Sequence, residues 1–303
     1  MKALLFSGQG AQKVGMGKSL YENVPIAREL YDQAENTLGF EFKKICFEGP
    51  ENTLTETRFC QPALYVQGFA IARILRECGH LDGLKAALGL SLGELTAYAI
   101  AGVWDFETGL RIVAERGRLM QQACDATKGG MAAVVGGTIE EAGKLCAAFD
   151  IDVANLNCPG QTVISGDYDK VAAAAAAAGA KNHGSFKLVK QLVVAGAYHS
   201  RLMEPARKAF EQFLAPIEFK TPKLTVFTNT TGQAISEPAA LKEALVKQVV
   251  STVRWEDCLR GAFALGCTDF YECGPGAVLS GMMKRTEPAA RVTAINEYGE
   301  LPT

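Results

Sequence analysis

The sequence predicts an α/β protein with a mainly parallel sheet, interrupted once by a small ferredoxin-like (βαββαβ) domain. Apolar, strand-like segments alternate with amphipathic, helix-like segments in both the first and the last part of the chain, which favours a parallel sheet covered by helices. Between these parts the expected order changes to strand-helix-strand-strand-helix-strand. With 303 residues, of which 48% are apolar, the chain is long enough for a large and a small domain. We therefore expect one core built from residues 1–127 and 195–303, and an inserted domain at 128–194.

The first part of the chain is expected to contribute two strands and four helices to the core. Pro62 is compatible with the first turn of its helix, where a missing N–H costs little. Gly79 ends that helix, and Gly117 lies inside the last one, where glycine costs about 1 kcal/mol and often marks a close approach by another group. The expected elements are a strand at 2–6, helices at 27–38 and 57–77, and a strand from 86 into a turn at 89–93. A helix then runs from this turn to 102, and another follows at 106–126.

The inserted domain begins where Lys128-Gly129-Gly130 changes the character of the chain. Asp167 has the position of an N-cap, and Gly179 that of a helix end. The domain's expected strands lie at 131–135, 152–155, 162–165 and 185–189, with helices at 139–149 and 167–178. After it we expect helices at 203–213, 241–250, 255–265 and 278–284, and strands at 224–228 and 268–272.

Composition excludes several classes of protein. A formal net charge of −2 argues against a nucleic-acid partner, which calls for a basic surface. The sequence opens without a basic and apolar leader and contains no apolar run of membrane length, so we expect no membrane association. Nine scattered cysteines without a C-x-x-C pair are typical of reduced thiols in the cytoplasm and not of disulfides or a zinc site. We expect no metal and no resident cofactor.

A G-x-S-x-G pattern at Gly89 to Gly93 provides a candidate nucleophile, Ser91. The pattern is short and also arises by chance, but here it lies between an apolar strand and a helix, as in a hydrolase-like α/β core. In this context the serine occupies a strained corner and the first N–H groups of the helix face any oxyanion formed beside it. The alternative is an ordinary tight turn.

The chain has three histidines that could serve as the base for Ser91: His80, His183 and His199. His199 follows the inserted domain directly, at a junction where clefts form, so we favour it over the two loop histidines. The glycine-rich segment Ser7 to Gln12 lacks the third glycine of a dinucleotide fingerprint, because Lys13 stands there. We interpret it as a flexible turn that presents backbone N–H groups.

Several segments occur in an order that resembles a known family. The chain is similar to malonyl-CoA:acyl carrier protein transacylases of bacterial fatty acid synthesis, and to the discrete acyltransferases of polyketide synthesis, over almost its whole length. The segments that carry this resemblance are Ser7 to Gln12, Gln61 to Leu64, Gly89 to Glu94, Glu115 to Gly117, Asn157 to Gln161, Tyr198 to Ser200 and Glu272 to Gly276.

The resemblance implies a catalytic dyad, with Ser91 as nucleophile and His199 as general base. It implies that the backbone N–H groups of Gln9 and Leu92 form the oxyanion hole. The histidine is held by a backbone carbonyl of the loop before Val253-Arg254-Trp255, which we assign to Ser251.

The implied substrates are malonyl-CoA and the phosphopantetheine thiol of an acyl carrier protein. Arg116 would bind the malonyl carboxylate and Gln61 would line the same pocket. A bidentate, permanently charged guanidinium suits a carboxylate. We expect ping-pong transfer by a monomer. A thioester hydrolase of the same fold is an alternative that has no need for Arg116, and a scaffold with a spent site is another.

The chain departs from the family's usual pattern at four places. Leu90 stands where histidine is common, and Ser251 where asparagine is usual. Tyr198 replaces a common phenylalanine, which would alter the choice of acyl group slightly. The segment between residues 180 and 199 is longer than usual.

Overall fold

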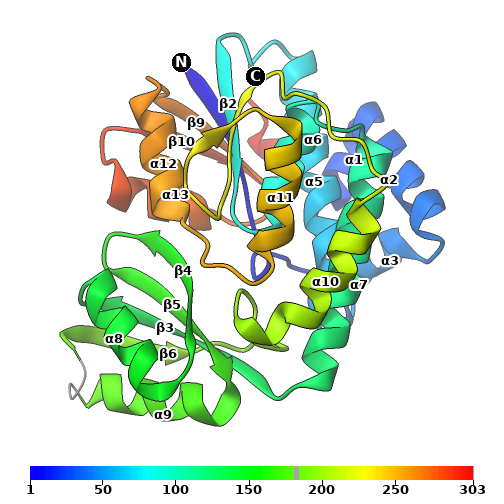
Figure 1. The fold of residues 1–303 in the computed structure, drawn as a ribbon. Helices are drawn as coiled ribbons and strands as arrows, with labels where there is room; N and C mark the ends of the chain where they lie inside the picture. The colour runs from blue at the N-terminus through cyan, green and yellow to red at the C-terminus, as the bar shows by residue number, and fades with distance from the viewer. Residues whose placement is uncertain (181–183, 303) are drawn as a thin grey trace.

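The computed structural model describes residues 1–180 and 184–302, and it has two sheets (Figure 1). The larger sheet has six strands in the order β10-β9-β1-β2-β7-β8, parallel except for the β7–β8 pair. It is the predicted mainly parallel sheet. Its strands are β1 (Lys2–Phe6), β2 (Leu84–Gly89), β7 (Thr225–Phe227), β8 (Ala234–Ile235), β9 (Asp269–Cys273) and β10 (Arg291–Ile295).

Helices cover both faces of this sheet. Along β1, Leu4 and Phe6 pack into one hydrophobic cluster while Ala3 and Leu5 pack into another, so the strand is buried on both sides. The core helices are α1 (Lys18–Asn23), α2 (Pro25–Leu38), α3 (Phe42–Glu48), α4 (Glu51–Thr55), α5 (Thr57–Glu77), α6 (Leu92–Ile100), α7 (Phe106–Ala126), α10 (Glu204–Leu214), α11 (Pro238–Gln248), α12 (Trp255–Ala264) and α13 (Val278–Thr286), with short 3₁₀ helices at Arg201–Met203 and Tyr298–Glu300.

The smaller sheet is antiparallel, with strand order β4-β5-β3-β6. This order, with one helix after β3 and one after β5, is that of a ferredoxin-like unit. Asp167 caps the second helix by accepting from two backbone N–H groups, as predicted. The elements are β3 (Gly129–Gly136), α8 (Ile139–Phe149), β4 (Asp152–Cys158), β5 (Gln161–Asp167), α9 (Tyr168–Gly179) and β6 (Phe186–Gln191). The exact domain boundaries stay a prediction.

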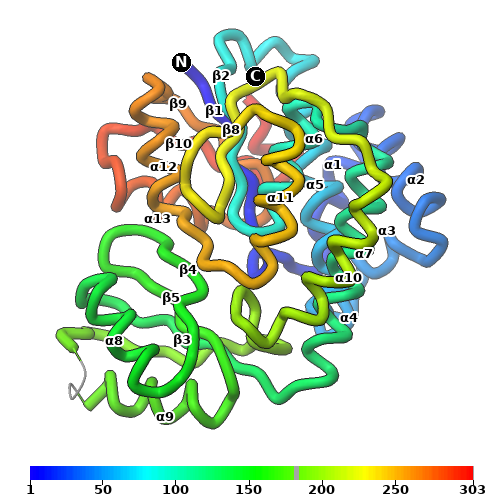
Figure 2. Tube along the Cα trace, viewed as in Figure 1, coloured from blue at the N-terminus to red at the C-terminus, as the bar shows by residue number. Residues whose placement is uncertain are grey.

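The small sheet lies against one end of the large core, as the chain trace shows (Figure 2). Backbone hydrogen bonds join the two: Leu156 N–H donates to Val253 O at 2.9 Å, and Val253 N–H donates to Ala154 O at 2.8 Å. Val253 follows α11, so the segment that leaves this helix is fixed to the small sheet.

Most predicted core elements are confirmed, several to the residue, but some predictions are wrong or incomplete. Pro62 is the sixth residue of α5 and not part of its first turn. Almost every residue around it is buried, so tertiary packing stabilises the helix despite the missing N–H. Five elements that the sequence did not predict are all short: α1, α3, α4, β8 and β10.

Candidate active site

Ser91 occupies a strained corner between β2 and α6. Its φ is 52°, in the left-handed region that non-glycine residues seldom adopt. A Cβ on Gly89 would lie 1.8 Å from the Gly93 carbonyl carbon, and one on Gly93 would lie 2.1 Å from Phe6 O. Both glycines of the motif are therefore required, because only they let strand, turn and helix approach so closely.

His199 contacts Ser91, although the whole inserted domain separates the two residues in the sequence. Its Nε2 lies 2.6 Å from Ser91 Oγ, and its Nδ1 lies 2.9 Å from Gln248 O. A carbonyl only accepts, so Nδ1 carries the proton and the neutral ring's Nε2 is free to accept from the serine. Burial, with the nearby Arg116 charge, lowers the pKa of His199 from 6.5 to about 4. The imidazole is therefore neutral near pH 7.

The assignment of the histidine's backbone partner to Ser251 is wrong. Gln248, three residues earlier, supplies the carbonyl. α11 ends at Gln248, where carbonyls lack helical partners, so the Gln248 carbonyl is available to the imidazole. Its hydroxyl instead donates back to Lys247 O at 2.7 Å.

Arg116 is buried behind Ser91, at 1% exposure. One Nη donates to Gln61 Oε1 at 2.8 Å, and the other donates to Gln248 Oε1 at 2.8 Å and to Ser91 Oγ at 3.2 Å. Its Nε has no hydrogen-bond partner among the described residues. Desolvation lowers its pKa to about 10, so the guanidinium remains charged at neutral pH. Its helix packs closely on α5, since a Cβ at Gly117 would lie 2.7 Å from Thr57 O.

Three polar residues that the sequence did not single out complete the site. Gln248 Nε2 donates to Ser91 O at 2.9 Å and to Glu94 Oε2 at 2.8 Å, so one amide links the corner, the arginine and a buried carboxylate. Asn229 Oδ1 accepts from Ser91 N–H at 2.6 Å. Burial raises the pKa of Glu94. No sequence signal marked Gln248 or Asn229, because both act through contacts made across the fold.

The two expected oxyanion donors lie beside Ser91. Leu92 is the first residue of α6, where backbone N–H groups have no carbonyl in a preceding turn. Gln9 lies in the loop after β1, which packs on the corner closely enough that a Cβ at Gly8 would be 2.6 Å from Leu90 O. The N–H of Ser91 is already taken by Asn229. The oxyanion role of Gln9 and Leu92 remains a prediction.

Ser91 and His199 lie in a cleft between the core and the small sheet, and Arg116 is buried behind Ser91. The cleft has a volume of about 270 Å³ and is lined by Gln9, Gln61, Ser91, Tyr198 and His199 together with residues of the small sheet and of α13. His80 precedes β2 whereas Ser91 follows it, so that histidine lies at the opposite end of the strand. His183 lies outside the described residues.

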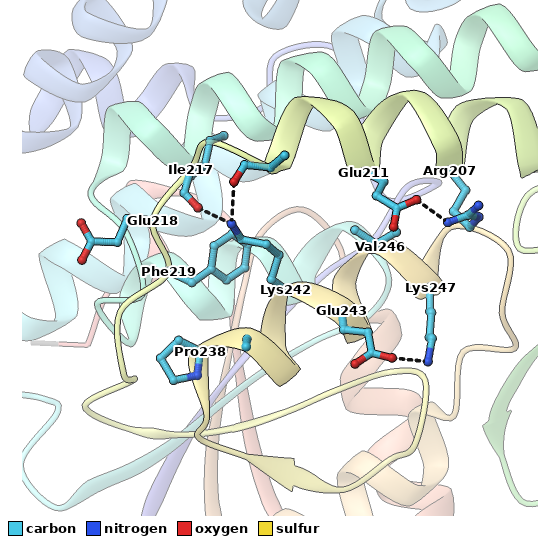
Figure 3. Close-up of a pocket in the computed structure, with 12 residues that line it drawn as sticks. Arg207, Glu211, Ile217, Glu218, Phe219, Pro238, Lys242, Glu243, Val246 and Lys247 are labelled. Carbon is cyan, nitrogen blue, oxygen red and sulfur yellow. Dashed lines mark hydrogen bonds and ion pairs between the residues drawn. The ribbon is translucent and has the colours of Figure 1, made fainter.

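A larger hollow of about 750 Å³ lies between α10 and α11 (Figure 3), and Ser91 is not among the residues that line it. Lys242, at its centre, donates to the carbonyls of Ala215 and Ile217. In the part of the chain that the structure describes, no cluster of three or more His, Cys, Asp or Glu side chains could hold a metal, and no helix is long and apolar enough to cross a membrane.

Comparison with known proteins identifies the family and relatives of the whole chain. The family model of the acyl transferase domain matches residues 3–298. A malonyl CoA-acyl carrier protein transacylase of Bacillus subtilis is 37% identical over 97% of this chain and 93% of its own. A polyketide biosynthesis malonyl CoA-acyl carrier protein transacylase of Bacillus subtilis is also 37% identical, over 96% of this chain and 98% of its own. A malonyl-transacylase solved in complex with its type II polyketide acyl carrier protein superposes with a TM-score of 0.94 at 32% identity, over 99% of this chain and 97% of that one.

Proposed function

The chain belongs to the acyl transferase family, and we propose that it transfers malonyl from malonyl-CoA to the phosphopantetheine thiol of an acyl carrier protein. One observation carries the choice of acyl group: a charged guanidinium, 1% exposed, lies 3.2 Å from the hydroxyl of a serine that a neutral imidazole contacts at 2.6 Å. A carboxylate on the acyl group would satisfy that buried charge.

In the first half-reaction, Ser91 Oγ attacks the thioester carbonyl carbon while His199 Nε2 takes its proton. The oxyanion accepts hydrogen bonds from the backbone N–H groups of Gln9 and Leu92, and the α6 dipole stabilises its negative charge. The C–S bond then breaks, and coenzyme A leaves as a thiol with the proton that His199 held. The product is a malonyl ester on Ser91.

In the second half-reaction the carrier's thiol replaces coenzyme A in the same cleft. His199 takes the thiol proton as sulfur attacks the ester carbonyl, and it returns this proton to Ser91 Oγ when the ester bond breaks. The imidazole starts each half neutral, in keeping with its lowered pKa. All of these groups come from one chain, and a monomer is the working unit that we propose.

Arg116 selects acyl groups that carry a carboxylate, because any other acyl group leaves the buried guanidinium without a negatively charged partner. Such an unpaired charge costs about 2–5 kcal/mol, enough to reject acetyl-CoA, a common competitor. Gln61 Oε1 and Gln248 Oε1 fix the guanidinium plane before the substrate arrives. Most of the reorganisation is thus complete in the free enzyme.

Fatty acid biosynthesis is the first pathway that we propose for this transfer. Loading of a polyketide carrier is a second candidate, because the polyketide relative is as similar as the other, at 37% identity. Both use the same chemistry. The nine cysteines, all free thiols, support a cytoplasmic location.

The test is to incubate the protein with malonyl-CoA and measure its intact mass, first alone and then with a phosphopantetheinylated acyl carrier protein. We expect a malonyl adduct on Ser91 that persists in buffer and moves to the carrier. Rapid loss of the adduct to water, with no malonyl-carrier formed, would instead favour the thioester hydrolase.

A further inference from the structure

Tyr198, the residue before the histidine, places a hydroxyl in the cleft that the mechanism above does not use. The side chain is 6% exposed. Its hydroxyl lies 2.5 Å from Thr57 Oγ1 and accepts from Gln9 Nε2 at 3.1 Å, and the same Nε2 lies 3.3 Å from Thr57 Oγ1. Three polar side chains from three separate segments therefore form a closed triangle beside the candidate oxyanion loop.

Thr57 is a fixed corner of this triangle. It is fully buried at the start of α5, and its N–H donates to Gln121 Oε1 of α7 at 2.9 Å. The close approach of Gly117 to Thr57 O holds the two helices together at this point. Thr57 is thus tied to the packed core.

Gln9 is the adaptable corner. It lies between Gly8 and Gly10, and Gly10 has a φ of 102°. Glycine on both sides gives a backbone little stiffness of its own. The hydrogen bonds of the Gln9 side chain to Tyr198 and Thr57 therefore help to fix the direction of the Gln9 N–H.

We propose that the Tyr198 hydroxyl, anchored by Thr57, holds the Gln9 side chain and so aims the Gln9 backbone N–H at the oxyanion. Tyr198 is then a positioning residue for acyl transfer and acts through Gln9. This proposal rests on the oxyanion role given to Gln9 in the proposed function. A donor must lie within about 2.7–3.1 Å of the oxyanion and point toward it, so a loop that swings freely loses much of this stabilisation.

The first test replaces Tyr198 with phenylalanine, which keeps the ring and removes only the hydroxyl. We expect the rate of Ser91 acylation by malonyl-CoA, followed by quenched-flow intact mass, to fall about three- to tenfold while KM stays within about twofold. Thr57→Val should lower the rate similarly, and Thr57→Ser should restore it. Tyr65→Phe is the matched control, since it removes another buried tyrosine hydroxyl, bonded to Phe106 O, outside the site.

The second test asks whether the effect passes through Gln9. In a Gln9→Ala background, Tyr198→Phe should have no further effect on acylation, because the tie is already gone. An equal fall in both backgrounds, or an unchanged rate with an altered ratio of methylmalonyl to malonyl transfer, would overturn the proposal. If Tyr198→Phe fails to fold, Thr57→Val takes its place.

A reagent independent of acyl specificity separates this proposal from the proposed function. An alkyl fluorophosphonate phosphonylates an active serine, with fluoride leaving as the Ser91 oxygen bonds to phosphorus, and its oxyanion needs the same donors. We expect the same fall for Tyr198→Phe with this reagent. If wild-type protein reacts with the phosphonate but not with malonyl-CoA, the proposed function is wrong, while the phosphonate rates still decide the role of Tyr198.

Discussion

The molecule has two hollows of very different character. The groove between α10 and α11 is the larger, about 750 Å³ against about 270 Å³ for the Ser91 cleft. Its cations already have partners: Arg207 pairs with Glu211 at 2.9 Å, and Lys247 pairs with Glu243 (Figure 3). These are water-exposed pairs of the kind worth little energetically. The charged pairs drawn in this groove are already formed within the chain.

The smaller cleft holds the opposite arrangement. Among the described residues Arg116 pairs with no carboxylate directly, and the amide of Gln248 links it to Glu94. Ser91 and His199 both have positive φ. Backbone strain and a buried charge without an ion-pair partner both lower the stability of the folded state. Such features persist where function requires them. These features indicate the site better than volume does.

The largest effect is expected for Ser91→Ala, which removes the only atom able to carry the acyl group. Intact mass after incubation with malonyl-CoA should show no adduct, and transfer to the carrier should fall by at least about 10⁴-fold. Ser236→Ala, at an exposed loop serine, is the control and should transfer normally. An adduct that persists in Ser91→Ala would show that another residue is the nucleophile.

Arg116→Ala should remove the preference for acids. We expect kcat/KM for malonyl-CoA to fall about 100-fold or more while acetyl transfer holds or rises, because the buried charge no longer penalises a neutral acyl group. Arg111→Ala on the same helix, where the side chain is exposed and paired with Glu107, is the matched control. If malonyl preference survives the loss of Arg116, the guanidinium has no role in selection.

The pH dependence reports the burial of His199. Because its pKa is about 4, the rate of acylation should be nearly constant from pH 8 down to pH 5, whereas an ordinary histidine would halve the rate near pH 6.5. The folded-state pKa lies below the unfolded one, so its contribution to stability is present above about pH 6.5 and is lost as pH falls toward 4. A midpoint near 6.5 in the acylation profile would contradict the buried, neutral imidazole.

The smallest effect is expected in the groove. Lys242→Ala removes two hydrogen bonds to backbone carbonyls and should lower the free energy of unfolding by about 1 kcal/mol. Transfer to the carrier should stay within about twofold of wild type. A large loss of transfer, with stability unchanged, would mean that the groove takes part in function and that the contrast between the two hollows is wrong.

Sequence patterns predicted the long elements and the principal chemistry because both depend on local signals. The 21-residue helices α5 and α7 were predicted to the residue, since their apolar periodicity extends over several turns. The G-x-S-x-G turn carries its own geometric requirement. In contrast, Gln248 and Asn229 act through contacts made across the fold, and neither has a sequence neighbour that announces its role. The error at Ser251 has the same origin, because the correct carbonyl lies only three positions earlier and the turn after α11 decides between them.

The most direct measurement is the ratio of Ser91 acylation rates for wild-type protein given malonyl-CoA and acetyl-CoA in competition, read as the masses of the two acyl-enzymes at early times. The buried guanidinium predicts that malonyl is favoured by about 30-fold or more, the lower limit of a 2 kcal/mol penalty. A ratio near one would mean that Arg116 does not select the acyl group, and the account of this site would be wrong.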